Sequence, residues 1–212
     1  MRQHVNPLSK YFEEIEPIPP LREIFKRSDL PLHLDIGFGS GGFLFKLASE
    51  NKNWNYLGIE IREKLVMNAK TKLVDTDINN LYFAFGNADN LIKDFMSKLP
   101  RKILCSVSIN FPDPWFKKKH HKRRVIQPDF LRNFSELMKS GSLLFIKTDV
   151  KELFQYMDQI ILNSLIFEKL EISQFKYLDS YNPSQIKTER ELYTLRNKVL
   201  IHKQIYKKND YF

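Results

Sequence analysis

Residues 32–42 read LHLDIGFGSGG and contain four of the seven glycines of the chain. The apolar run 32–36 has the length of a buried strand, and residues 43–48, FLFKLA, repeat apolar side chains at helical spacing. A strand, a glycine-rich turn and a helix in this order bind nucleotide-like ligands through exposed amides and the helix N-terminus. We therefore predict such a ligand at this turn, although tight turns also use glycine for steric reasons alone.

A glutamate stands near the end of the next apolar run. Residues 54–61, WNYLGIEI, predict a second strand, with Glu60 placed 23 residues after Gly37. In doubly wound sheets, an acidic side chain about 20 residues beyond the first glycine accepts hydrogen bonds from the ribose hydroxyls of the ligand. Glu60 is therefore a candidate ribose ligand, and a strand-end carboxylate without a ligand is the alternative.

Strand and helix patterns alternate through the rest of the chain. We expect helices over 62–74, 89–99, 127–139 and 150–162, and strands over 81–86, 102–111, 142–147, 167–172 and 198–206. Gly141 is expected to cap the helix 127–139 at its C-terminus. The alternation predicts an α/β fold, a doubly wound and mostly parallel sheet with helices on both faces. Residues 1–30, with four prolines, are expected to form an N-terminal extension to a domain over 31–212.

Positive charge is concentrated in one segment of the chain. The net charge is +9, and residues 117–124, KKKHHKRR, hold six cations and no carboxylate. Such a run predicts a polyanionic partner, nucleic acid before an acidic membrane surface, while a solvated loop is the alternative without a partner. No apolar run has the length of a membrane-spanning helix, and Cys105 is the only cysteine. We expect a soluble, cytoplasmic protein without a multi-cysteine zinc site.

Residues 110–115, NFPDPW, connect the fourth expected strand to the basic run. Two prolines bracket Asp113, so the backbone is stiff and not helical there. Ligands of doubly wound sheets bind outside the carboxyl ends of the strands. We therefore expect Asp113 beside the ligand, with a simple turn as the alternative reading of Pro-Asp-Pro.

Five segments together resemble the bacterial tRNA (guanine-N7)-methyltransferases. They are residues 35–41 (DIGFGSG), 58–60 (GIE), 110–124 (NFPDPW, then Lys117 and HKRR), 148–149 (TD) and 188–191 (TERE). The segment NFPDPW leading into HKRR is the most specific of them, because the glycine turn would fit any class I methyltransferase. The resemblance implies a Rossmann-like class I methyltransferase fold, S-adenosyl-L-methionine as cofactor and tRNA as partner. It also implies methylation of guanine N7 in the tRNA variable loop, at position 46 of conventional tRNA numbering.

The family pattern implies a role for each matching residue. Cofactor contacts fall on Asp35, Gly37, Glu60, Asn87 and Asp113, and Asp113 is also the catalytic residue. Substrate contacts fall on Lys117, Asp149, Thr188, Glu189, Arg190 and Glu191, and RNA contacts on Lys119, His120, His121, Lys122, Arg123 and Arg124. Many members carry Asp where Asn87 stands, so Asp89 is an alternative contact for the adenine. Thr188 and Glu191 also fit a helix capping box, and we expect no metal, no membrane and no obligate protein partner.

The chemistry of guanine N7 agrees with this set of residues. N7 has an in-plane lone pair and no proton, and a sulfonium methyl group is already electrophilic, so positioning is the main task of the protein. Carboxylates can accept hydrogen bonds from guanine N1–H and N2–H₂ and favour a cationic product, and Asp113, Asp149 and Glu191 are the candidates. Three alternatives stay open: a dinucleotide-dependent oxidoreductase, an RNA methyltransferase acting on an exocyclic amine, and a non-catalytic RNA-binding module.

Overall fold

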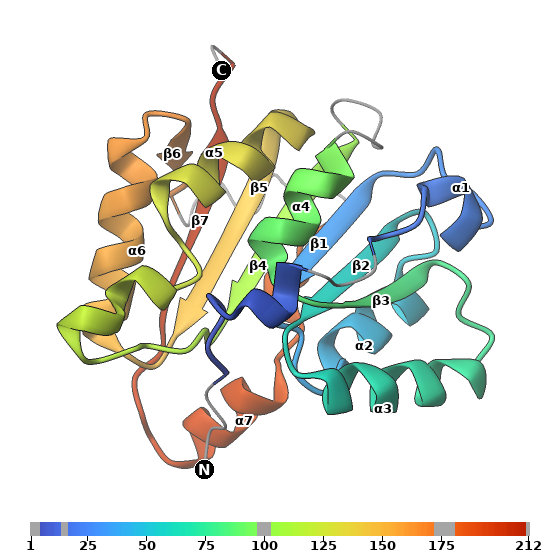
Figure 1. Cartoon of the computed structure of the whole chain (residues 1–212), viewed down its shortest axis with the longest axis horizontal. Helices are drawn as coiled ribbons and strands as arrows, with labels where there is room; N and C mark the ends of the chain where they lie inside the picture. The colour runs from blue at the N-terminus through green and yellow to red at the C-terminus, as the bar shows by residue number, and fades with distance from the viewer. Residues whose placement is uncertain (1–4, 14–16, 97–102, 172–180, 211–212) are drawn as a thin grey trace.

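A seven-stranded sheet forms the centre of the molecule (Figure 1). The computed structural model describes residues 5–13, 17–96, 103–171 and 181–210. The expected extension 1–30, helix 89–99, and strands 102–111 and 167–172 lie in part outside these residues. The strands are β1 (Leu32–Ile36), β2 (Asn55–Glu60), β3 (Leu81–Phe85), β4 (Leu104–Asn110), β5 (Met138–Thr148), β6 (Phe167–Lys169) and β7 (His202–Lys208).

The strand order is β3-β2-β1-β4-β5-β7-β6. Strands β1 to β5 run parallel, whereas β7 pairs antiparallel with both β5 and β6. The predicted doubly wound and mostly parallel sheet is therefore confirmed. The strand order reverses between β1 and β4, which is the point where such sheets bind their ligands.

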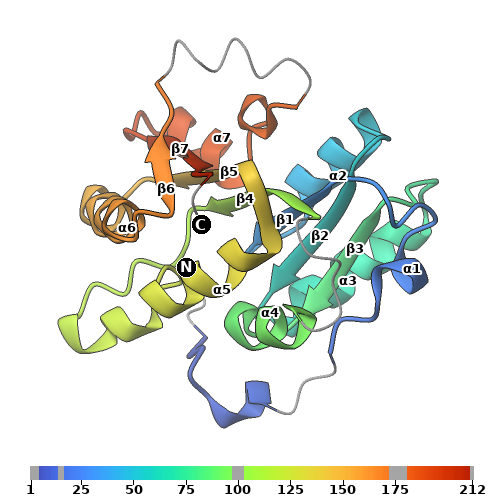
Figure 2. The ribbon, with the colours of Figure 1, turned by 90° about the horizontal axis from the view of Figure 1, so that it is seen from above.

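Helices cover both faces of the sheet, as Figure 2 shows. They are α1 (Leu21–Ile24), α2 (Gly42–Glu50), α3 (Glu63–Val74), α4 (Ala88–Met96), α5 (Pro128–Leu137), α6 (Lys151–Asn163) and α7 (Glu189–Arg196), with 3₁₀ turns η1 (Lys10–Glu13), η2 (Lys118–Arg123) and η4 (Pro183–Gln185). Buried side chains of α4, α5 and α6 pack on one face and those of α2 and α3 on the other. The sheet is therefore shielded from water on both sides, as parallel sheets require.

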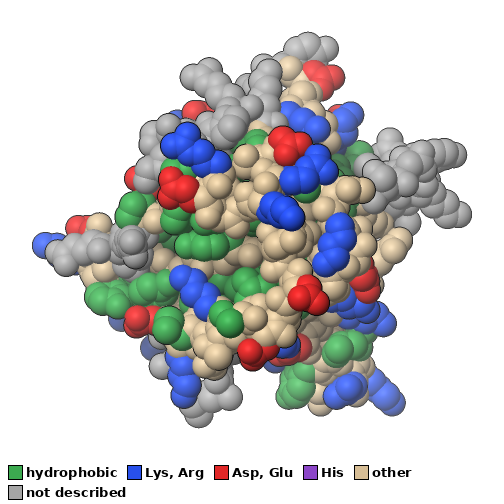
Figure 3. Space-filling model, turned by 90° about the vertical axis from the view of Figure 1, so that its right-hand side faces the viewer, with side chains coloured by type: hydrophobic (Ala, Val, Ile, Leu, Met, Phe, Trp, Pro, Cys, Tyr) green, Lys and Arg blue, Asp and Glu red, His purple; other side chains and the backbone are tan. Residues whose placement is uncertain are grey.

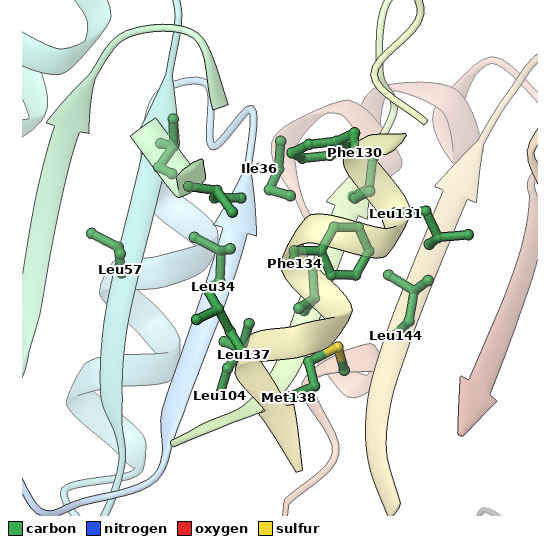
Figure 4. Close-up of a cluster of buried hydrophobic side chains, with 14 of the residues drawn as sticks. Leu34, Ile36, Leu57, Leu104, Phe130, Leu131, Phe134, Leu137, Met138 and Leu144 are labelled. Carbon is green, nitrogen blue, oxygen red and sulfur yellow. The ribbon is translucent and has the colours of Figure 1, made fainter. Parts of the chain in front are cut away.

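Helix α5 fills the centre of the larger core cluster (Figure 4). Its residues Phe130, Leu131, Phe134 and Leu137 face Leu34 of β1, Leu104 of β4 and Leu144 of β5. Apolar positions at i, i+1, i+4 and i+7 form one helical face, which is why this segment is a helix lying on the sheet. Ile18, Leu21 and Phe25, from the expected N-terminal extension, are buried in the same cluster.

The junction between α5 and β5 differs from the prediction. The helix ends at Leu137, and Met138 is already extended, with φ −84° and ψ 137°, so no glycine caps the helix. Gly141 lies inside β5 with φ +78°, next to the point where the pairing with β4 loses its register. The C-cap assignment of Gly141 was wrong, because its left-handed backbone serves an irregularity of the strand.

The late strands also begin and end elsewhere than expected. Strand β6 covers Phe167–Lys169 and ends before Leu170 and Glu171, so the strand predicted over 167–172 was too long. Strand β7 starts at His202, four residues after the predicted start at Lys198. Lys198 itself has φ +55°, in the turn that follows α7, so it cannot begin a strand. Within the described residues, no helix is long and apolar enough to cross a membrane.

Candidate functional site

Two adjoining cavities lie at the carboxyl ends of the parallel strands. The larger, of about 830 Å³, lies between β2, β3, the 110–115 segment and residues 5–13, and the smaller, of about 240 Å³, lies between the glycine turn and the start of α7. Both are lined by Gly37, Arg62, Asn110, Phe111 and Asp113. In Figure 1 the arrowheads of β4 and β5 point to this edge of the sheet, beside α7. Because these walls are shared, the cavities form two compartments of one site, at the carboxyl ends of the strands where the strand order reverses.

The glycine turn forms the rim between the two compartments. Gly37 and Gly39 have φ values of +79° and +64°, and a Cβ atom on either would meet no heavy atom within 4 Å. These glycines are therefore required by the backbone conformation and leave open space in front of the turn. The amide of Gly37 donates to the carbonyl of Ile59 at 2.7 Å, which fixes the turn to β2.

Asp35, at the end of β1, belongs to a buried polar network. Its Oδ1 accepts hydrogen bonds from Ser108 Oγ at 2.5 Å and from Asn110 Nδ2 at 3.2 Å. When Asp35 is ionised, Ser108 Oγ donates its proton to it and accepts from His33 Nε2, 2.9 Å away. His33 Nδ1 then accepts from Ser106 Oγ at 2.8 Å, which defines the neutral tautomer of the ring. Burial raises the pKa of Asp35 to about 7 and lowers the pKa of His33 to about 3.

Glu60 is buried at the end of β2 and faces the larger compartment. Its Oε2 accepts from the amide of Gly39 at 3.0 Å, which links the second strand to the glycine turn. The carboxylate also accepts from the backbone amide and the guanidinium of Arg62. The predicted candidate thus lies beside the turn, with Arg62 as a neighbour that the sequence analysis did not identify.

Asn87 follows β3 and lines the larger compartment. Its Oδ1 accepts from the amide of Asp89 at 2.8 Å, and its Nδ2 donates to the carbonyl of Pro7 at 2.7 Å. Asp89 lines the same compartment and accepts from Lys93 Nζ and Asn133 Nδ2. Residues near Pro7 therefore close this end of the cavity, which no local pattern in the sequence indicated.

The 110–115 segment has an unusual backbone. Phe111 and Trp115 have φ values of +50° and +46°, a conformation that large aromatic residues rarely adopt. The amide of Phe111 donates to the carbonyl of Lys147 at 2.7 Å, so β5 holds one end of the segment. Asp113 lies between these two strained positions and lines both compartments. Strain of this kind persists where surrounding structure enforces it, and it gathers at functional sites.

The C-terminal site residues divide into two groups. Thr188, Glu189 and Arg190 line the smaller compartment, and Glu189 Oε1 lies 3.3 Å from the position of a Cβ atom on Gly42. Thr188 caps α7 by accepting from the amide of Glu191 at 3.0 Å.

Glu191 and Asp149 line neither compartment and form ion pairs. The side chain of Glu191 pairs with buried Lys147 at 2.9 Å, so only one half of the expected capping box is formed. Asp149 pairs with Arg190. Both ion pairs join the start of α7 to the end of β5, which positions the residues that do line the cavity.

The basic segment lies beside the larger compartment and folds into η2. Lys117, Lys118, Lys119 and Lys122 are exposed, and His120 and Arg123 pack against the ring of Trp115. Lys117 lines neither compartment. In Figure 1 this segment extends at the lower left, below α6.

Arg124 differs from the other basic residues because its side chain is only 6% exposed. Its Nε donates to the carbonyl of Pro114 at 2.9 Å, and its guanidinium lies 4.4 Å above the ring of Tyr156. The ring of His121 contacts the guanidinium of Arg124 and the ring of Tyr156. Arg124 therefore supports the Pro-Asp-Pro segment from within the protein.

Relatives of this chain are methyltransferases by name. Residues 29–204 match the protein family described as "Putative methyltransferase". The chain is 56% identical over 208 residues to the tRNA (guanine-N(7)-)-methyltransferase of Prochlorococcus marinus subsp. pastoris (strain CCMP1986 / NIES-2087 / MED4), covering 98% of this chain and all of that protein. It is 41% identical to the protein of the same name from Prochlorococcus marinus (strain MIT 9313), covering 99% of this chain and 89% of that protein.

Solved structures share the fold at low sequence identity. The 16S rRNA methyltransferase KamB is 14% identical with a TM-score of 0.55, covering 89% of this chain and 91% of that one. The [4+2]-cyclase SpnF is 13% identical with the same TM-score, covering 89% of this chain and 78% of that one. Since one is named a methyltransferase and the other a cyclase, the fold alone does not determine the reaction.

Proposed function

We propose a guanosine of the tRNA variable loop as the target of this chain, which belongs to the tRNA (guanine-N(7)-)-methyltransferase family. Membership at 56% identity over the whole length means that the chain is a methyltransferase, which transfers a methyl group from S-adenosyl-L-methionine to guanine N7 of tRNA. The variable-loop target follows from the family resemblance, and the observation that supports methyl transfer between two bound groups is the pair of joined cavities with Asp113 in their common wall. The larger compartment suits a nucleoside-sized cofactor. The smaller compartment adjoins it and would take the guanine ring.

The residues of the larger compartment fit this cofactor. Glu60 is a buried carboxylate beside the glycine turn, suited to two ribose hydroxyls, and the space in front of Gly37 and Gly39 is open. Asn87 and Asp89 lie further along the cavity, where we propose that they contact the adenine. Asp35 lines the smaller compartment and would face the cationic methionine end. When bound there, S-adenosyl-L-methionine supplies a methyl group on a positively charged sulfur.

Asp113 is the residue that we assign to the reaction. It lies between the two compartments, so its carboxylate can accept hydrogen bonds from guanine N1–H or N2–H₂ while N7 faces the methyl group. N7 has no proton to lose, so the protein needs no general base, and its task would be to hold the N7 lone pair in line with the methyl group that the cofactor would supply. Methylation leaves a positive charge on the purine, which a fixed carboxylate stabilises.

We assign substrate contacts to Thr188, Glu189 and Arg190, which line the smaller compartment. Glu191 and Asp149 have a different role in this proposal, because their carboxylates pair with Lys147 and Arg190. They hold α7 against β5 and so act as positioning residues. The exposed lysines of residues 117–122 and the partly exposed Arg123 are proposed to contact RNA phosphates.

Methyl transfer to defined tRNA tests the target. With labelled S-adenosyl-L-methionine and total tRNA, we expect 7-methylguanosine after nuclease digestion, located in the variable loop by mass spectrometry. A transcript in which adenosine replaces the variable-loop guanosine should accept no label. Label at guanine N7 elsewhere in the tRNA would refute the proposed target and keep the family assignment.

Replacement of Asp113 tests the role of its carboxylate. Asp113→Asn keeps the size of the side chain and removes its charge, so we expect the transfer rate at saturating tRNA and cofactor to fall about 100-fold. Binding of tRNA, measured by filter retention, should change far less. Asp77→Asn, at an exposed position after α3, is the matched control and should keep full activity. A loss of tRNA affinity with an unchanged transfer rate would assign Asp113 to binding instead.

A further inference from the structure

The carboxylate of Glu60 already has as many donors as it can accept. Gly39 N donates to Oε2 at 3.0 Å, and the backbone N of Arg62 donates to Oε1 at 3.0 Å. The guanidinium of Arg62 adds Nε to Oε1 at 2.9 Å and Nη2 to Oε2 at 2.8 Å. A carboxylate offers about four lone-pair positions. All four are therefore taken by donors of the chain itself.

The two ribose hydroxyls can donate to Glu60 only if donors that now bond its carboxylate move away. The two backbone amides belong to the glycine turn and to the N-cap of α3, so they are fixed by the fold. The Arg62 side chain is 34% exposed, whereas that of Glu60 is 2% exposed. Only the guanidinium can move without unfolding a neighbouring element.

A second carboxylate, that of Asp113, lies in the same part of the site as the guanidinium of Arg62. Arg62 and Asp113 both line both compartments, so the side chain of Arg62 lies in the wall between them. The hydrogen bond to Glu60 is the largest cause that raises the pKa of Arg62, and the charge of Asp113 also contributes. Asp113 is thus within electrostatic reach of the guanidinium before any movement.

We propose that the Arg62 guanidinium occupies the ribose positions of Glu60 in the empty enzyme and transfers to Asp113 when the cofactor binds. The inference rests on the proposed cofactor site. The exchange keeps a buried carboxylate compensated before binding, which avoids the cost of an unpaired buried charge. It also fixes the Asp113 carboxylate when the methyl donor is present, and it leaves two of the four lone-pair positions of that carboxylate for guanine N1–H and N2–H₂. Arg62 is therefore a positioning residue, which couples occupancy of one compartment to the carboxylate that faces the other.

Removal of the guanidinium tests the competition. Arg62→Ala should bind S-adenosyl-L-methionine about three- to tenfold more tightly by calorimetry, because no ion pair must be broken. Arg62→Lys, with one charged group in place of two donors, should lie between the wild type and the alanine variant. Arg27→Ala removes an exposed pair with Asp29, away from both compartments, and is the matched control, which should leave the affinity unchanged. Equal or weaker binding by Arg62→Ala would overturn the proposal.

The transfer to Asp113 is tested by a double-mutant cycle and by a direct signal. Asp113→Asn should weaken cofactor binding about threefold more in the wild type than in the Arg62→Ala background. An equal effect in both backgrounds would overturn the transfer. In the wild type, the Nε–H resonance of Arg62 should shift in proportion to bound cofactor, and an unchanged resonance at saturation would overturn the displacement. If the wild type bound no S-adenosyl-L-methionine at all, the proposed cofactor site would fail instead.

Discussion

Asp35 and His33 both bond to Ser108, and their shifted pKa values change the stability of the fold with pH in opposite directions. Between pH 3.8 and about 7, the unfolded Asp35 carboxyl is ionised and the native one protonated, so rising pH favours unfolding. Between about pH 3 and 6.5, the unfolded His33 ring is protonated and the native ring neutral, so falling pH favours unfolding. Each slope reaches about 1.4 kcal/mol per pH unit, and the two oppose each other across their common range.

Substitution of Asp35 should therefore reveal the slope of His33. Asp35→Asn can keep the hydrogen bonds from Ser108 and Asn110, because its amide oxygen accepts as the carboxylate does. From pH 6.5 down to 4, its unfolding free energy should fall by up to about 1.4 kcal/mol per pH unit more than that of the wild type. Urea unfolding at several pH values measures this difference. A profile parallel to that of the wild type would contradict the raised pKa of Asp35.

Single residues differ in how far the sequence could identify them. Gly37 and Glu60 follow local patterns, a turn after an apolar run and an acid at a strand end, so both could be predicted to lie at the site. Ser108 meets Asp35 only because β4 pairs with β1 in a particular register, 73 residues apart in the chain. Arg62 was missed for another reason, since its contact with Glu60 depends on a rotamer and not on spacing.

At the scale of elements, the helix and strand types were predictable and their ends were not. The α5 pattern predicts a helix, but Met138 enters β5 at once because it pairs with Leu104. The turn at 110–115 was predictable from its prolines. The left-handed backbone of Phe111 was not, because the amide of Phe111 bonds to Lys147 on β5, a strand that is remote in sequence and pairs with β4 only in the folded sheet.

Strand β2 contains a glycine whose absent side chain lets α2 approach. A Cβ atom on Gly58 would lie 2.6 Å from Leu44 Cδ1 and 2.7 Å from Phe38 Cδ1. Gly58→Ala should therefore lower the unfolding free energy by about 1–3 kcal/mol, measured by urea denaturation. Gly141→Asn is the comparison, since the surroundings of Gly141 are open and asparagine tolerates its positive φ. A Gly58→Ala variant as stable as Gly141→Asn would show that α2 shifts at little cost.

At the scale of the whole molecule, the basic segment 117–124 lies on one side of the protein. Figure 3 views the molecule from the right-hand side of Figure 1, and on this face lysines and arginines are interspersed with acidic side chains. The basic segment 117–124 lies on the left of Figure 1, and its exposed lysines have no acidic residue among them in sequence. An RNA that binds along this segment would reach the larger compartment, which Lys122 and Arg123 also line.

Replacement of the exposed lysines should weaken RNA binding by electrostatics alone. A variant with Lys117→Ala, Lys118→Ala and Lys119→Ala removes three exposed cations, none of which lines either compartment. Each phosphate contact contributes about 0.7–0.9 to the slope of log affinity against log salt, so the slope should become shallower by up to about two to three units. Cofactor affinity and thermal stability should stay as in the wild type, because none of the three side chains makes a contact within the core.

Arg124→Ala supplies the contrast within the same segment. Its guanidinium holds the carbonyl of Pro114 and packs on Tyr156, so its loss should cost about 1.5–3 kcal/mol of stability. The salt slope of tRNA binding should keep its wild-type value, since a buried cation releases no counterions from RNA. Filter binding over a salt series and thermal unfolding separate the two variants. If Arg124→Ala lowered the slope as the lysine variant does, the guanidinium would have to turn outward on binding RNA, and the cation would serve both the fold and the substrate.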